Sequence, residues 1–166
     1  MAALLTLGWD LKMPNTLAIG VAFSDQAISG GSIDATPIGA VTPSTVVGSS
    51  VYSNGELGYT AAAQGTVTQA TSKSTAVTLN KSAGRITLNA ASLAAQTNVS
   101  FTLNNSFISA NDTLIVTISS GATIESYNCW VNSLSAGTAS ITLRNITAAT
   151  ALAEAVVINF ALIHCV

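Results

Sequence analysis

Residues 97–105, TNVSFTLNN, alternate apolar and polar side chains along their whole length. Successive side chains of an extended strand face opposite ways, so Val99, Phe101 and Leu103 would share one side. That side can enter a core while the Asn, Ser and Thr side chains of the other meet water. The stretch therefore predicts a half-buried β-strand.

The same alternation recurs on either side of this stretch, between turns rich in Gly, Asn, Ser and Asp. It predicts strands at 66–69, 75–80, 84–89, 113–119, 126–132, 138–147 and 154–166. Residues 90–95 hold good helix formers and predict a single helical turn. The last strand, EAVVINFALIHCV, is almost continuously apolar, which predicts a central strand buried on both faces or one at a subunit interface. Strands at this spacing predict an all-β sandwich or barrel of about eight strands.

Charge is scarce throughout the chain. Only 7% of its 166 residues are charged, against about 25% in an ordinary globular protein. Isolated soluble proteins usually keep a charged surface that resists association. This composition therefore predicts that much of the surface contacts neighbouring proteins. The net charge of −2 favours neither nucleic acid nor an anionic membrane as a partner. No apolar stretch is long enough to predict a transmembrane helix.

Residues 1–63 differ in character from the rest of the chain. They contain all three prolines and predict an extended N-terminal arm with a few short strands, the best of them at 17–23. The start lacks a basic region ahead of its apolar residues, so no signal peptide is expected. The apolar side chains near the start would need a partner surface, and they are the predicted partner-binding residues: Leu4, Leu5, Leu7, Trp9 and Leu11.

Residue types used in catalysis are few. The single histidine, His164, is expected to be a packed or satisfied imidazole, and Cys165 beside it would face the other way. A glycosidase needs two carboxylates about 5 to 10 Å apart, and the sequence leaves a pair such as Asp112 and Glu125 open. No zinc spacing, phosphate-binding loop or cluster of calcium ligands occurs. We therefore predict no catalytic residue, no cofactor and no metal.

Residues 126–132 carry the candidate surface contacts. The alternation places Tyr127, Cys129 and Val131 on one face and Trp130 on the other, so either Trp130 is exposed or the register is reversed. An exposed tryptophan would be a contact anchor, and Tyr127 and Trp130 are the two candidates. Cys129 and Cys165 are expected to be buried apolar side chains, with a disulfide between adjacent strands as the alternative.

The charged side chains between residues 73 and 154 have structural interpretations that require no binding or catalytic role. Lys73, Lys81 and Arg85 fall on or between the first strands, where lysine commonly keeps sheet edges soluble. Arg144 and Glu154 could pair across neighbouring strands, which would contribute about 0 to 1 kcal/mol. Neither interpretation indicates a function.

Three stretches together carry a resemblance to known proteins: GTVTQATSKSTAVTLNK (65–81), RITLNAASLAA (85–95) and EAVVINFALI (154–163). They resemble a domain at the C-terminal end of tailed-bacteriophage virion proteins, both capsid decoration or cement proteins and head or tail fibre proteins. The resemblance implies an antiparallel, jelly-roll-like β-sandwich over residues 64–166. It further implies a homotrimer on the outer surface of a virion, made in the host cytoplasm.

Two functions fit this resemblance. The first is a non-enzymatic capsid decoration or cement protein whose arm binds the major capsid protein and stabilises the shell. The alternative is a head or tail fibre protein that contacts host surface glycan, with Tyr127, Asn128 and Trp130 as the candidate sugar-binding cluster. The short chain has no repeated shaft, which favours the first function.

Overall fold

The computed structural model describes residues 46–165. The chain divides into two units, Met1–Val51 and Tyr52–Val166, and every described strand belongs to the second. The strand expected at 17–23 and the five apolar residues predicted to bind a partner lie outside the described residues.

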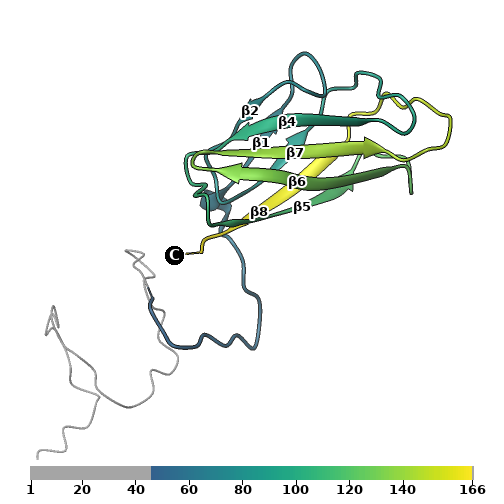
Figure 1. Cartoon of the computed structure of the whole chain (residues 1–166). Coiled ribbons are helices and arrows are strands. Elements are labelled where there is room, and N and C mark those ends of the chain that lie inside the picture. The colour runs from purple at the N-terminus through teal and green to yellow at the C-terminus, as the bar shows by residue number, and fades with distance from the viewer. Residues whose placement is uncertain (1–45, 166) are drawn as a thin grey trace, which may run out of the picture. The chain divides into compact units, whose positions relative to one another are not determined.

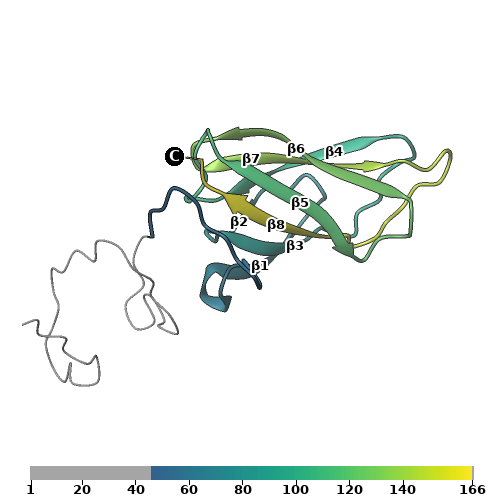
Figure 2. The same ribbon diagram turned by 90° about the horizontal axis from the view of Figure 1, so that it is seen from below.

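Eight strands form two four-stranded sheets packed face to face (Figures 1 and 2). Sheet A has the order β1-β3-β8-β5, and sheet B has the order β2-β4-β7-β6. A short 3-10 helix, Ala61–Ala63, precedes the first strand. The strands are β1 (Gln64–Thr68), β2 (Val77–Thr78), β3 (Ala83–Thr87), β4 (Asn98–Asn104), β5 (Thr113–Ser120), β6 (Tyr127–Ser135), β7 (Thr138–Asn145) and β8 (Val157–Ile163). The predicted all-β sandwich of about eight strands is confirmed.

The connections explain why the sheets are mixed instead of purely antiparallel. Every connection crosses to the other sheet except the β6–β7 hairpin. The chain therefore reverses direction in the opposite sheet and returns to the first sheet in its original direction. As a result β1 pairs with β3 in parallel, and β2 pairs with β4 in parallel, at one edge of each sheet. The antiparallel prediction holds for the other four strand pairs and is wrong for these two.

The core lies between the sheets and follows the predicted alternation. In β4, Phe101 and Leu103 are buried and Val99 packs against them. Across the sandwich, Ile158 and Leu162 of β8 have no exposed surface. Burying such side chains contributes about 1.5 to 3 kcal/mol each. The inward faces of the strands thus hold the two layers together.

The last strand is central, as predicted, but it is not buried on both faces. β8 lies between β3 and β5, and its burial alternates along the strand. Phe160 is buried, Ala161 beside it is half-buried, and Ile163 is 50% exposed. The outer face of sheet A therefore holds apolar side chains, such as that of Ile163, that are partly exposed to water.

The helical turn expected at 90–95 does not form. Leu93 pairs instead with Leu152, and the two residues exchange backbone hydrogen bonds of 2.8 and 3.0 Å. The side chain of Asn145 donates a further bond of 2.9 Å to the carbonyl oxygen of Leu93. Tertiary hydrogen bonds hold this segment extended and override the helix propensity of its alanines.

Candidate functional site

The outer face of sheet A carries an exposed apolar patch at the C-terminal end of β8. Ile115 of β5 lies opposite Ala161, which in turn lies opposite Ala83 of β3. Ile163 lies one row further along, opposite Thr113. Ile115 is 46% exposed and Ile163 is 50% exposed. The two isoleucines thus form a small exposed apolar patch on a face that is otherwise mostly polar.

The outer faces of both sheets are almost uncharged. The strand registers place Arg85 as the one charged residue on the outer face of sheet A and Arg144 as the one on sheet B. The other outward positions hold Thr, Ser, Asn, Gln or apolar side chains. Contacts made by these faces would depend on apolar burial and neutral hydrogen bonds, which salt screens little.

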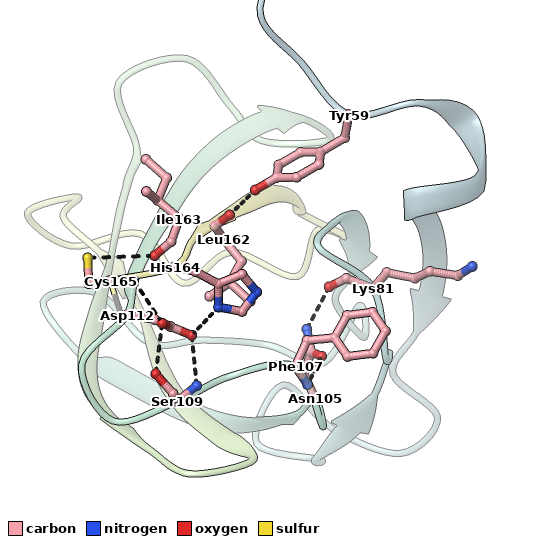
Figure 3. A network of polar contacts seen from close by, with 10 residues as sticks. All are labelled: Tyr59, Lys81, Asn105, Phe107, Ser109, Asp112, Leu162, Ile163, His164 and Cys165. Carbon is pink, nitrogen blue, oxygen red and sulfur yellow. Dashed lines mark hydrogen bonds and ion pairs between the residues drawn. The ribbon is translucent and has the colours of Figure 1, made fainter. Parts of the chain in front are cut away.

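A shallow groove adjoins this patch where the chain enters the sandwich. It has a volume of about 570 Å³ and is lined by Tyr59, Gln64, Gly84, Arg85, Asn159 and Phe160, among others. The Tyr59 hydroxyl donates a hydrogen bond to the carbonyl oxygen of Leu162, which fixes the ring beside β8 (Figure 3). The ring itself is 39% exposed. Arg85 supplies the only charge in the lining.

A buried carboxylate, that of Asp112, holds residues 164 and 165 close to this patch (Figure 3). Asp112 Oδ2 accepts hydrogen bonds from the Ser109 backbone N–H at 2.7 Å and from His164 Nδ1 at 3.0 Å. Its Oδ1 accepts from the Ser109 hydroxyl at 2.8 Å and from the Cys165 N–H at 3.2 Å. The loop before β5 and the residues after β8 are thereby tied together.

These contacts make a clamp and not a catalytic triad. The Ser109 hydroxyl donates to Asp112, whereas a serine nucleophile would donate to the histidine. The hydrogen bond from the Ser109 backbone and three further donors lower the pKa of Asp112 to about 2. His164 is hydrogen-bonded as expected, but its side chain is 49% exposed and therefore not packed.

The clamp predicts a defined response to acid. The pKa of Asp112 is lowered from 3.8 to about 2 in the folded chain, so its stabilising effect is complete above pH 3.8 and is lost as the pH falls toward 2. Asp112→Asn should therefore unfold at a lower temperature than the wild type near neutral pH, and this difference should shrink on acidification. Thermal unfolding followed by circular dichroism at several pH values measures it. Ser109→Ala keeps the carboxylate and should retain most of the pH dependence; a pH-independent difference for Asp112→Asn would contradict the clamp.

The two candidate surface contacts lie on opposite sides of β6. Tyr127 faces inward and packs against the core, and burial raises the pKa of its hydroxyl. Trp130 lies opposite Thr142 on the outer face of sheet B and is half-buried. Thr142 is only 3% exposed, and its hydroxyl lies 2.7 Å from that of Ser100. The structure therefore does not bring Tyr127 and Trp130 together into one surface cluster.

Two interpretations of charged residues are corrected. Lys73 is 2% exposed, and its ammonium group donates to the carbonyl oxygens of Asn89 and Glu154, so it does not lie at a soluble edge. Burial lowers the pKa of Lys73. Arg144 and Glu154 do not pair. Arg144 instead donates to Gln96 at 3.1 Å, and the Glu154 carboxylate accepts from Thr123.

The cysteines and carboxylates form no reactive cluster within residues 46–165. Cys129 is half-buried, Cys165 is exposed, and both are free thiols. Asp112 and Glu125 flank opposite ends of β5, an eight-residue strand, which at about 3.3 Å per residue separates them far beyond glycosidase spacing. No group of three or more potential metal ligands occurs in this part of the chain.

The alternation within β5 contains a sequence signal for the apolar patch. Its sequence TLIVTISS places Ile115 between Thr113 and Thr117 on the side away from the core. An isoleucine on a polar strand face is an exposed apolar side chain once the register is known. Its proximity to Ile163 follows only from the pairing of β5 with β8.

No helix in the described part of the chain is long and apolar enough to cross a membrane. Comparisons with known protein families, with curated proteins and with solved structures found no match to this chain.

Proposed function

We propose that this chain is a non-enzymatic virion structural protein, a capsid decoration or cement protein that binds the major capsid protein. It acts as a homotrimer on the outer surface of the capsid and uses no cofactor, nucleic acid or membrane. The observation that supports this most is the pair of nearly uncharged outer faces, with one arginine each. The sequence resemblance to tailed-bacteriophage virion proteins supports a structural role in the virion, and it is shared by decoration and fibre proteins.

The proposed mechanism is burial of apolar surface between the arm and the capsid. Each Å² removed from water contributes about 25 cal/mol, so a few leucines and a tryptophan supply useful affinity. A trimer that engages several capsid subunits at once gains further through multivalency. Because few charges are involved, the attachment should be insensitive to salt.

Trp130 gives the alternative function its specific support. Its half-buried ring lies on a face lined by hydroxyl and amide side chains, which together would offer a sugar an aromatic contact and neutral hydrogen bonds. In that case the chain would be a head or tail fibre protein, and the outer face of sheet B would contact host surface glycan.

One pair of variants separates the two functions. Replacing the arm residues Leu4, Leu5, Leu7, Trp9 and Leu11 with serine should abolish co-sedimentation with capsids that lack the protein, while Trp130→Ala should bind them normally. The reverse pattern, with glycan-array binding lost only in Trp130→Ala, would favour the fibre protein. Capsid binding retained by the arm variant would contradict the proposed attachment.

A further inference from the structure

The shallow groove beside Tyr59 lies where side-chain size changes on the outer face of sheet A. One row across the sheet is polar and places Thr66, Arg85 and Asn159 on neighbouring strands. Adjacent strands lie about 4.8 Å apart, so these three side chains stand close together. In the next row β3 contributes only the methyl group of Ala83, which leaves room for the groove of about 570 Å³.

Hydrogen bonds within the sandwich hold the walls of the groove in place. The Tyr59 hydroxyl donates to the carbonyl oxygen of Leu162 (Figure 3). The side chain of Gln64 donates to the carbonyl oxygen of Tyr59 at 2.7 Å. Because these groups are positioned in advance, a ligand would lose little affinity to the ordering of side chains.

Arg85 is the charge that this groove presents. It is exposed, and within residues 46–165 it forms no ion pair and makes only the contact of Nε with Asn159 at 3.4 Å. Glu56, the carboxylate that precedes Tyr59 in the chain, lines a separate hollow instead of this groove. Only 7% of the chain is charged, so a guanidinium group without a carboxylate partner at a concave site favours an anionic ligand. The planar guanidinium can donate two parallel hydrogen bonds to one carboxylate.

We propose that this groove binds an acidic sugar, a pyranose ring that carries a carboxylate. The carboxylate accepts two hydrogen bonds from Arg85, and the C–H face of the ring contacts Tyr59. The hydroxyl groups of the sugar meet the side chains of Thr66, Gln64 and Asn159. The groove of about 570 Å³ falls within the range of small-ligand sites, about 300 to 1,000 Å³, which combine apolar surface with a few placed polar groups.

A sugar fits this arrangement better than an acidic peptide does. Peptides that bind a sheet commonly add a strand to its edge through main-chain hydrogen bonds. Here the polar groups are side chains on the face of the sheet, next to an aromatic ring, and they suit hydroxyl groups and a C–H face. The site is separate from Trp130, which lies on sheet B, and it does not depend on capsid binding.

Isothermal titration calorimetry of the full-length protein tests the site with trigalacturonate, sialyllactose, neutral lactose and a tetraglutamate peptide. The wild type should bind at least one of the two acidic sugars, and lactose and the peptide should bind more weakly. Arg85→Gln should weaken binding of the acidic sugar about 10-fold or more, because it removes the charged donor. Arg144→Gln should bind like the wild type and is the matched control, since Arg144 is the one charged residue on the outer face of sheet B. Circular dichroism verifies that each variant is folded.

Four results would overturn the proposal: no binding of either acidic sugar at millimolar concentration, equally tight binding of lactose, equal weakening by Arg144→Gln, or tighter binding of the peptide. Amide chemical shifts in NMR spectra locate the bound sugar. Changes confined to β1, β3 and β8 support the groove, whereas changes centred on Trp130 would place the sugar on sheet B and contradict it. The arm variant at residues 4–11 should bind the sugar normally, so loss of capsid binding and loss of sugar binding are distinguishable.

Discussion

Gly121→Ala is expected to lower the free energy of unfolding by about 2 to 4 kcal/mol. Gly121 lies in the β5–β6 loop with a φ of +71°, a conformation that disfavours a side chain. A Cβ atom there would overlap the carbonyl oxygen of Ala155 and lie 3.2 Å from its carbonyl carbon. Both atoms belong to the backbone, so the loop or the segment before β8 would have to move.

Gly137→Ala is the matched control for this substitution. Gly137 lies in the β6–β7 hairpin with a φ of +78°, but nothing lies within 4 Å of its Cβ position. The control therefore retains the conformational cost, about 1 kcal/mol, without the overlap. Urea unfolding of both variants measures the difference between them, and equal losses would show that overlap with Ala155 has no effect.

Asn145→Ala is expected to cost about 3 kcal/mol, because several buried polar groups lose their partners at once. Asn145 has no exposed surface, and its amide donates to the carbonyl oxygens of Leu93 at 2.9 Å and Thr150 at 2.8 Å. Its side-chain oxygen accepts from the Thr147 N–H at 3.0 Å and from the Thr147 hydroxyl at 2.8 Å. One side chain thus fastens the connection before β4 to the connection before β8.

Asn128→Ala provides the comparison on the same sheet. Asn128 is exposed on β6, and its replacement should change the free energy of unfolding by no more than about 0.5 kcal/mol. Chemical unfolding monitored by tryptophan fluorescence compares the two variants. A loss at Asn145 as small as that at Asn128 would mean that water replaces all four hydrogen bonds.

Much of the fold could be predicted because alternation is a local property. The strand around Phe101 and Leu103 was readable from side-chain pattern alone. For the apolar last strand the pattern left two alternatives, a central position and a subunit interface, and the sheet order shows the central position. Alternation does not indicate the relative direction of two paired strands. The parallel pairs β1–β3 and β2–β4 were therefore not predicted. Alternation also could not show that Leu93 would pair with Leu152, residues 59 positions apart in the chain.

Charged and polar residues were harder to place than apolar ones. Lys73 resembles an edge lysine in sequence, yet carbonyl oxygens from two distant segments hold it in the interior. Asp112 and His164 are 52 positions apart, and only the pairing of β5 with β8 brings them together. A hydrogen bond depends on the position of both partners, whereas burial of an apolar side chain requires only that it leave water.

The sequence by itself determined the all-β class, the inward faces of the strands and the shortage of charge, because each is set by the order and kind of neighbouring side chains. Only the tertiary structure decided which strands pair, and hence that Ile115 and Ile163 share one exposed face near Arg85. The physical reason is that alternation assigns each residue to a side of its strand, while the register between strands assigns its neighbours.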